Sequence, residues 1–279
     1  MDLPVVIIGC GYIGRILALR LKSQQKAVMG IVKTEESRIN LEKQGIPAIA
    51  ADITDNRFPR VLPPASALVF SASSNRSEAG LFGKIFSIGL DQVLESAKGI
   101  PLLLVSSTSV YSQVEGEWVN EDSPAIPTTP SGVILKQAEQ KVLERGGTVL
   151  RASGIYGPQR AYRITGLVER RVRIDPRKKW INQVHGFDLA RAIEHFLTVP
   201  GLFNISDDLP TLEEDFYSWL CQNLNVPFPP LGQKPPHPKR GYSNKRISNK
   251  KAKSMGFRLD FPTFKEGYSN LVQIYKNPS

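Results

Sequence analysis

The first glycine-rich stretch constrains the fold more than any other part of the sequence. An apolar run of strand length, residues 5–8, is followed by glycines at 9, 11 and 14 and then by a helical pattern. Gly9 permits a tight turn, Gly11 lets a pyrophosphate approach the backbone, and Gly14 lets the helix lie close on the strand. The amino end of the helix favours an anion through its dipole and its unpaired N–H groups. The pattern predicts a dinucleotide site, the alternative being a turn that binds nothing. The predicted contacts here are Gly9, Gly11, Tyr12, Ile13 and Gly14.

The end of the next predicted strand, residues 27–32, is where a fold of this kind reads the adenosine ribose. No carboxylate follows it, and Lys33 and Thr34, with Arg38 further on, offer positive charge and hydrogen-bond donors instead. This favours NADP over NAD, with Lys33 as a contact. NAD stays open, because an exposed lysine at a strand end is common.

Strands and helices alternate along the first half of the chain. Strands are predicted at 48–53, 67–72 and 101–105, with a helix over 82–97 before the last of them. This alternation predicts an α/β fold with a doubly wound parallel sheet, in which ligands bind at the carboxyl ends of the strands. Further cofactor contacts are therefore expected at such ends, namely Asp52, Ile53 and Ser71.

Composition restricts the class of protein. The chain has 279 residues, of which 41% are hydrophobic, so it can bury an enzyme-sized core. It carries no recognisable signal peptide and no apolar run of membrane-spanning length, which favours a cytoplasmic protein without membrane contact. Cys10 and Cys221 lack metal-ligand spacing, so neither a disulfide nor a metal site is expected.

The net charge of +10 raises the question of a nucleic-acid partner. The surplus is concentrated in residues 160–179 and 234–258, which in sequence show no regular aromatic interleaving, zinc finger or recognition helix. Nucleic acid is therefore disfavoured. A solvated basic loop or a pocket for a small phosphorylated ligand fits the arginines of residues 160–179, since guanidinium groups bind phosphate in a bidentate manner.

Four segments together resemble one enzyme group. They are the Gly9 turn and residues 106–111, 150–158 and 184–193. The sequence is similar to the extended short-chain dehydrogenase/reductase superfamily, which includes the NAD-dependent epimerase/dehydratase family. The resemblance implies a Rossmann domain over residues 1–157. A smaller, partly interleaved substrate region would follow over 158–279, with segments near 180–207 returning to the sheet.

The resemblance also implies a catalytic Ser, Tyr and Lys. The phenol exchanges a proton with the substrate oxygen, the hydroxyl orients that oxygen, and the ammonium lowers the pKa of the phenol and holds the nicotinamide ribose. Ser107 and Lys136 match the serine and the lysine, but the tyrosine position is Gly132. The chain thus resembles an atypical branch that lacks the catalytic tyrosine. Ser107, Tyr111 and Arg160 are the expected substrate contacts.

Three explanations of Gly132 remain open. The acid/base can be another group, such as Tyr111, Tyr156, Tyr162 or a water. Alternatively, the reaction does not require the phenol. As a third explanation, the protein binds cofactor without turnover. The sequence therefore predicts an NAD(P)-dependent oxidoreductase or epimerase acting on a phosphorylated or sugar-like carbonyl compound. The alternative is a non-catalytic NADP(H)-binding sensor or scaffold. The oligomeric state, a homodimer included, stays open.

Local patterns give further expectations. Ser131 is predicted to cap a helix whose apolar face includes Leu135, and Asp188 to cap a helix beginning at Leu189. His185 is expected to be a packed histidine at a strand end. Towards the carboxyl end, the sequence predicts a strand at 203–206, a helix over 212–224, an extended Pro-rich segment over 227–240, and a short helix capped by Ser248 and ended by Gly256.

Overall fold

A computed structural model describes residues 2–73, 80–232 and 242–276. The chain divides into two compact units. The first unit comprises Met1–Ser107, Pro130–Arg151 and Ala190–Phe203, and the second comprises Thr108–Thr129, Ala152–Leu189 and Asn204–Ser279. Because the chain passes repeatedly from one unit to the other, each unit is built from segments that are far apart in sequence.

The first unit is built on a seven-stranded sheet in the order β11-β7-β5-β4-β1-β2-β3. The strands are β1 (Val5–Ile8), β2 (Val28–Val32), β3 (Ala48–Ala50), β4 (Ala67–Phe70), β5 (Leu102–Ser107), β7 (Thr148–Ala152) and β11 (Gly201–Ile205). The pairings β1–β2, β1–β4, β2–β3 and β4–β5 are parallel. The chain winds outward from β1 in one direction and returns to start β4 on its other side, so the carboxyl ends of β1 and β4 mark a topological switch point.

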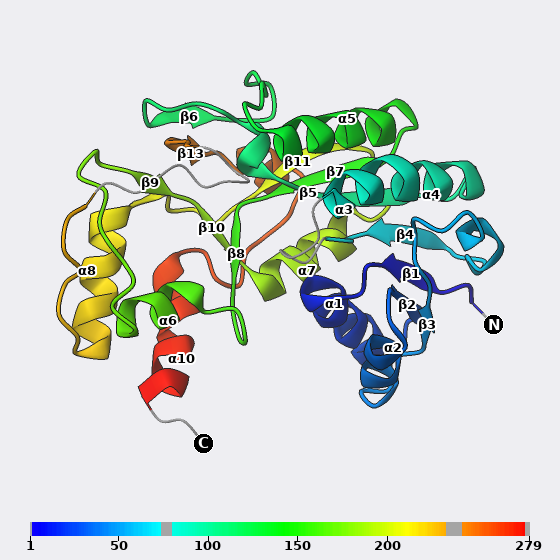
Figure 1. The fold of residues 1–279 in the computed structure, drawn as a ribbon, viewed down its shortest axis with the longest axis horizontal. Coiled ribbons are helices and arrows are strands. Elements are labelled where there is room, and N and C mark those ends of the chain that lie inside the picture. Colours follow the sequence, from blue (N-terminus) through cyan, green and yellow to red (C-terminus); the bar gives the residue numbers. More distant parts are fainter. Residues whose placement is uncertain (1, 74–79, 233–241, 277–279) are drawn as a thin grey trace. The chain divides into compact units, whose positions relative to one another are not determined.

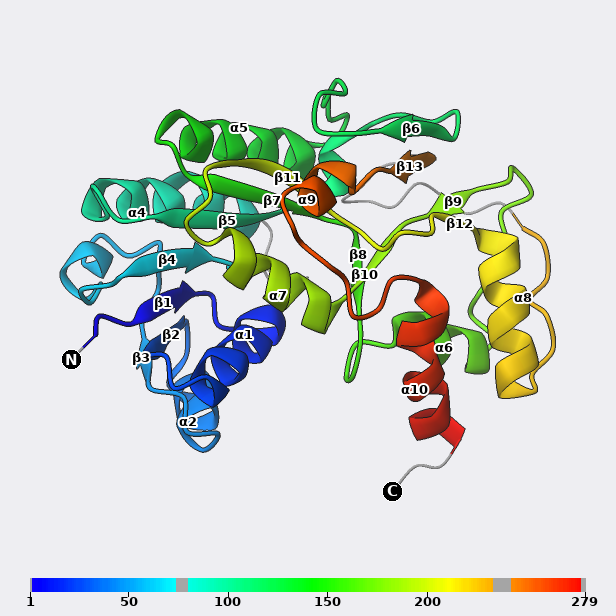
Figure 2. The same ribbon diagram turned by 180° about the vertical axis from the view of Figure 1, so that it is seen from behind.

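Helices cover both faces of this sheet. Figures 1 and 2 show α1 and α7 along one face and α4 and α5 along the other. The helices are α1 (Tyr12–Ser23), α2 (Glu35–Glu42), α3 (Leu81–Lys84), α4 (Leu90–Ser96), α5 (Pro130–Glu144) and α7 (Gly186–Phe196), with a π-helical stretch over Ile85–Gly89 and a 3₁₀ turn over Phe58–Arg60. Arg20 and Lys26 both pair with Glu194, at 2.6 and 2.7 Å, and so tie the region of α1 to α7. The predicted doubly wound fold is confirmed.

The described residues of the second unit form three two-stranded sheets and four helices. Its strand pairs are β6 (Glu117–Val119) with β13 (Lys245–Ile247), β8 (Gly154–Tyr156) with β10 (Gln183–His185), and β9 (Trp180–Ile181) with β12 (Thr211–Leu212). Its helices are α6 (Tyr162–Val168), α8 (Glu213–Leu224), α9 (Lys250–Ser254) and α10 (Phe264–Lys276), with a 3₁₀ turn over Thr108–Val110. Aromatic rings fill its core, where Tyr156 stacks on Tyr268 with centroids 4.3 Å apart and Phe216 meets Tyr268 edge-on.

Two predicted helix caps are wrong. Helix α5 begins at Pro130, so Ser131 lies inside its first turn. Helix α7 begins at Gly186, so Asp188 also lies inside a first turn. Its buried carboxylate instead accepts hydrogen bonds from the N–H groups of Asp260 and Phe261, at 2.7 and 2.9 Å. Asp188 was predicted as a helix cap, and these two donors lie more than 70 residues away in sequence.

Other local expectations are met in part. The predicted strand at 203–206 corresponds to β11 of the main sheet. Residues 180–185, which were expected to return to that sheet, instead supply one strand each, β9 and β10, to two of the small sheets. His185 ends β10, is 3% exposed and packs on the ring of Phe261, as expected. Ser248 Oγ accepts from the N–H of Lys250 at 3.4 Å, although the cap residue of α9 is Asn249. Part of the predicted Pro-rich segment, residues 233–240, lies outside the described residues.

Two further findings concern the described part of the chain as a whole. None of its helices combines the length and the apolar character that crossing a bilayer requires. Among the same residues, no group of three His, Cys, Asp or Glu side chains is placed to hold a metal ion. Cys10 and Cys221 are both buried thiols, and burial raises the pKa of Cys10 to about 12, which keeps it protonated and unreactive.

Candidate functional site

The turn between β1 and α1 has the geometry that its glycines suggest. The N–H groups of Gly9 and Cys10 both donate to the carbonyl oxygen of Ile31, at 2.9 and 3.0 Å, and Ser71 Oγ donates to that of Gly9 at 3.1 Å. Gly9 has φ of +80°, and a Cβ there would lie 2.3 Å from the Cα of Ala72. At Gly11 the nearest atom to such a Cβ is 3.9 Å away. Position 9 is therefore closed to any side chain, and the backbone at position 11 is open to a ligand.

The amino end of α1 is suited to an anion. Its first turn holds no acidic side chain, and Gly11, at the cap position, supplies no side-chain acceptor. The first turn of α1 and its cap therefore supply no negative side chain to the positive end of the helix dipole. Ile13 and Gly14 are buried, and a Cβ at Gly14 would lie 2.9 Å from Ile7 Cγ2, so these two residues bring the helix close to the sheet.

A cavity of about 590 Å³ opens beside this turn, entirely within the first unit. Its size is within the usual range for cofactor sites. It is lined by Gly9, Gly11, Ile31, Val32, Lys33, Thr34, Glu36, Ser37, Ala51, Asp52, Ile53, Ala72, Ser73, Leu81 and Ile85. Among the predicted cofactor residues, Gly9, Gly11, Lys33, Asp52 and Ile53 belong to this lining. The other predicted cofactor residues are not part of the lining. They are Lys136 on α5 and four residues that surround or support the turn, namely Tyr12, Ile13, Gly14 and Ser71.

Lys33 and Asp52 lie together at the end of the cavity formed by β2 and β3. Lys33 Nζ is 3.4 Å from Asp52 Oδ2, and Asp52 Oδ1 accepts from the N–H and the hydroxyl of Thr54 at 2.9 and 2.7 Å. Burial alone would raise the pKa of Asp52, but these hydrogen bonds and the charge of Lys33 outweigh it and lower the pKa. Asp52 is therefore ionised at neutral pH.

The start of α2 adds polar groups to the same end of the cavity. Thr34 caps α2, its hydroxyl accepting from the N–H of Ser37 at 3.3 Å. The sequence analysis did not predict Glu36 and Ser37 as lining residues. The one indication in the sequence was that they closely follow Thr34, a typical cap residue for a helix. Arg38 turns to its own helix, donating to Glu35 at 2.8 Å and pairing with Glu42, and it is not among the lining residues.

Ser107 and Lys136 lie elsewhere in the first unit. Ser107 is the last residue of β5, and the side chain of Lys136 on α5 is 39% exposed, with Nζ 3.9 Å from Oε2 of Glu139. Glu139 is completely buried and binds Ser106 at 2.6 Å and Arg151 at 2.6 to 3.2 Å. Sequence reasoning missed Glu139, although a carboxylate on an apolar helix face is itself a signal.

The predicted substrate residues of the second unit differ in accessibility. Tyr111 is 1% exposed, and its hydroxyl donates to the carbonyl oxygen of Asn120 at 2.8 Å and to Asn204 Oδ1 at 3.0 Å. Arg160 is partly buried, donates to the carbonyl oxygen of Ile155 and lies over the ring of Tyr162. Tyr156 is buried, and burial raises its pKa. Of the three tyrosines considered as a substitute acid/base, only Tyr162 exposes most of its side chain.

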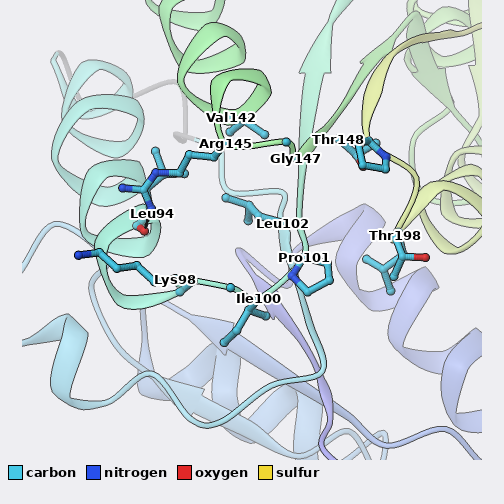
Figure 3. Close-up of a pocket in the computed structure, with 15 residues that line it drawn as sticks. Leu94, Lys98, Ile100, Pro101, Leu102, Val142, Arg145, Gly147, Thr148 and Thr198 are labelled. Atoms are coloured by element: carbon cyan, nitrogen blue, oxygen red, sulfur yellow. Dashed lines mark hydrogen bonds between the residues drawn. The ribbon is translucent and has the colours of Figure 1, made fainter.

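A second hollow in the first unit, of about 280 Å³, lies at the amino ends of β5 and β7 (Figure 3). Leu94, Lys98, Arg145, Thr148 and Thr198 are among its lining residues. Arg145 extends toward α4, where it donates to the carbonyl oxygen of Leu94. Because ligands of doubly wound sheets bind at the carboxyl ends of the strands, the cavity at the glycine turn is the stronger candidate site.

Comparisons with known proteins point to the same part of the chain. A family model described as the TrkA-N domain matches residues 5–82, which include the glycine turn and most of the lining of the cavity. The structure is similar to that of a putative NAD-dependent epimerase/dehydratase from Methylobacillus flagellatus, with 28% identity, a TM-score of 0.76 and coverage of 99% of both chains. No curated protein matches the sequence significantly.

More distant structures share the fold. A dTDP-glucose 4,6-dehydratase from Bacillus anthracis, solved with NAD, is 18% identical over 99% of this chain and 97% of that one, with a TM-score of 0.81. A UDP-glucose 4-epimerase from Thermus thermophilus, also solved with NAD, is 20% identical over 99% and 100%, with a TM-score of 0.79. These structures establish a Rossmann-type fold that other proteins use to bind NAD.

Proposed function

We propose that this chain binds a nicotinamide dinucleotide at the glycine turn and is an oxidoreductase or epimerase of the NAD-dependent epimerase/dehydratase type. One observation carries the proposal: Gly9 is sterically restricted to glycine, Gly11 exposes its backbone, and both line a cavity of about 590 Å³ at the amino end of α1. Backbone N–H groups and the helix dipole would hold the pyrophosphate there. The similar epimerase/dehydratase structures support this assignment.

We further propose a preference for NADP(H). Lys33, Thr34 and Ser37 provide an ammonium and two hydroxyls at the ribose end of the cavity, where a 2′-phosphate would be placed. Two carboxylates also line that end, but Asp52 already interacts with Thr54 and Lys33. Glu36 is the residue that opposes a phosphate, which makes it a direct test of the preference.

The chain's own residues have separate tasks in the proposed reaction. The bound cofactor would supply or accept hydride. Ser107 would orient the substrate carbonyl oxygen through its hydroxyl, and the Lys136 ammonium would hold ribose hydroxyls and stabilise negative charge that develops nearby. Since Gly132 has no side chain, the proton must come from another donor, and a water is the proposed source. Arg160 and its basic neighbours suit a phosphorylated or sugar-like substrate.

Binding is tested first. Calorimetric titration with NADPH and NADH should give saturable binding with the tighter constant for NADPH. Lys33→Glu should reverse that order, whereas Glu36→Gln should strengthen NADPH binding several-fold. Absence of saturable binding for either nucleotide at millimolar concentration would remove the proposal, while tighter NADH binding would remove only the cofactor preference.

Turnover is tested second, by following NADPH absorbance with ketones, aldehydes and nucleotide sugars. Lys136→Ala and Ser107→Ala should lower kcat by about 10²-fold or more, as expected for groups that act in the transition state. Gln137→Ala, an exposed neighbour on α5, is the matched control and should leave kcat unchanged. Equal rates in the Lys136 and Gln137 variants would refute the role of Lys136.

A non-catalytic NADP(H)-binding protein is the second candidate. Gly132 supplies no phenol, and Tyr111 and Tyr156 are both buried, which together favour this alternative. It predicts tight nucleotide binding without turnover of any carbonyl compound. Building the phenol back as Gly132→Tyr should then create reductase activity if Ser107 and Lys136 retain catalytic geometry.

A further inference from the structure

The second unit carries a surface on which cations stack against aromatic rings. The guanidinium carbon of Arg246 lies 5.2 Å from the ring centroid of Trp118 and 5.0 Å from that of Trp180. The guanidinium of Arg177 lies 4.4 Å from the ring of Tyr242, and Lys179 Nζ lies 5.7 Å from the same ring. We call this set the cation–aromatic platform: Trp118, Arg177, Lys179, Trp180, Tyr242 and Arg246.

The platform is accessible. Trp118 is 55% exposed although it is a tryptophan, and Arg177 is exposed as well. Trp180, Arg177 and Tyr242 also line an open hollow of about 600 Å³ in the same unit, together with the exposed Lys178. A single exposed ring carries little meaning, but here exposed and half-exposed rings and cations are grouped beside a hollow, an arrangement that suits a ligand with a flat apolar face.

Two asparagines, the buried Asn244 and the half-buried Asn182, fix the strands that carry the platform. Asn244 Oδ1 accepts from the N–H of Trp180 at 2.8 Å, and its backbone carbonyl accepts from Gly116 at 2.9 Å. Asn182 bridges to β13, donating to the carbonyl oxygen of Lys245 and accepting from the N–H of Ile247. The rings therefore stand on a backbone that is already ordered, which lowers the entropic cost of binding.

Charge on this surface is positive but partly compensated. Arg177 pairs with Asp175 at 2.7 Å, and Glu115 and Glu117 come from the neighbouring segment of β6. The basic residues of this surface that balance the charge of these acidic groups are Lys178, Lys179 and Arg246, and Lys245 is buried. A partner held by charge alone would gain little here, so ring stacking must supply much of the affinity.

We propose that the cation–aromatic platform binds single-stranded nucleic acid. Unpaired bases offer flat faces that stack on tryptophan rings and on arginine guanidinium planes, and the phosphates between them pair with lysine. A duplex hides its base faces, and an acidic peptide has no flat face for Trp118 and Trp180 to stack on. In sequence the two basic runs contain only Tyr162, Tyr242 and Phe257 as aromatic residues; the fold adds Trp118 from β6 and Trp180 from β9 to Tyr242. The proposal is independent of the dinucleotide site.

Intrinsic fluorescence gives a direct assay on the full chain without added dinucleotide. The chain has three tryptophans, and the third, Trp219, is half-buried and packs edge-on against Phe264 of the core of the second unit. Titration with a 15-nucleotide oligo(dT) should quench the fluorescence of Trp118 and Trp180 saturably, with an affinity that falls only modestly as salt rises, because few cations here are left to pair with phosphates. Trp118→Ala and Arg246→Ala should each weaken binding about tenfold, since each removes stacking with a base.

Conservative variants and competitors separate stacking from charge. Trp118→Phe keeps a ring and should retain most of the affinity, whereas Arg246→Lys keeps the charge and should not. Lys265→Ala removes an exposed charge on α10 and should have little effect. Any one of four results would overturn the proposal: no quenching, equal weakening by Lys265→Ala and Trp118→Ala, competition by poly-glutamate as strong as by oligo(dT), or dTMP binding as tightly as the oligonucleotide.

Discussion

At the scale of single residues, Gly9 and Gly11 of the turn between β1 and α1 are glycine for different physical reasons. Gly9 has positive φ and no room for a Cβ beside Ala72, whereas Gly11 has room and a negative φ. Gly9 is therefore required for the backbone to adopt this turn, whereas Gly11 keeps the backbone accessible to a ligand.

Alanine substitutions should separate these two roles. Gly11→Ala should change the free energy of unfolding by less than about 1 kcal/mol yet weaken NADPH binding at least about tenfold, because the new methyl group stands where the pyrophosphate approaches. Gly9→Ala should destabilise by about 2 kcal/mol or more through backbone strain and overpacking. Urea unfolding and calorimetry measure both effects. Full affinity in a folded Gly11→Ala variant would place the pyrophosphate elsewhere.

His185 makes the stability of the protein depend on pH. Burial lowers its pKa from 6.5 to about 4, because the protonated ring would be desolvated among aromatic side chains. The folded state therefore binds this proton less readily than the unfolded state. Its contribution to stability is complete above pH 6.5 and is lost as the pH falls towards 4.

The expected loss between about pH 7.5 and pH 5 is about 2 kcal/mol of unfolding free energy from His185 alone. His185→Asn removes the titration and retains an acceptor for the N–H of Phe187, which donates to His185 Nδ1 at 3.3 Å. Urea unfolding of both proteins at the two pH values measures the difference. If both proteins lose the same stability on acidification, His185 does not titrate as described.

At the scale of elements, a buried ion pair joins α5 to β7 and β5. Glu139 of α5 is completely buried, Arg151 of β7 is 1% exposed, and Ser106 of β5 donates to the same carboxylate. In a buried pair the loss of one partner leaves the other charge without compensation, which costs about 3–5 kcal/mol.

Glu139→Gln should therefore lower the free energy of unfolding by about 3 kcal/mol or more, because Arg151 keeps its charge. The control is Glu144→Gln, an exposed glutamate on the same helix, which should cost less than about 0.5 kcal/mol. Replacing both partners, as Glu139→Leu with Arg151→Met, should recover much of the loss. Equal stabilities of the Glu139 and Glu144 variants would show that the pair is not important for stability.

At the scale of the whole molecule, each of the two units is assembled from three separate stretches of chain. The candidate cofactor cavity lies in the first unit and the cation–aromatic platform in the second. Each site can be tested without the other, because no residue is shared between them.

Cofactor binding should stabilise the folded chain by mass action. NADPH at about one hundred times its Kd should add about 2.7 kcal/mol to the free energy of unfolding, provided that the unfolded chain does not bind it. The urea midpoint followed by circular dichroism should rise accordingly, and the rise should be absent in Gly11→Ala. A midpoint that stays constant at millimolar NADPH would contradict binding to the native state.

Residue patterns alone predict the parts of the structure that depend on neighbouring residues. The apolar run at 5–8, the glycine at 9 and the helical pattern after 14 specify a strand, a turn and a helix through short-range sterics and periodicity. The alternation of such segments then leads to a doubly wound sheet, since parallel strands need crossover helices. The fold and the location of the glycine turn could therefore be predicted from residue patterns.

Contacts between residues that are distant in sequence become apparent only in the folded chain. Asp188 looked like a helix cap and instead binds the backbone at Asp260 and Phe261; Glu36 and Ser37 line the cavity because of how α2 is placed after β2. Trp118 and Arg246 are far apart in sequence, yet β6 pairs with β13 and stacks their side chains. Local patterns specify an element and its buried face, but they do not specify register or the partner across a long loop. The register and the partner of each strand are set by the packing of the whole chain, because many alternative pairings are equally compatible with the local sequence.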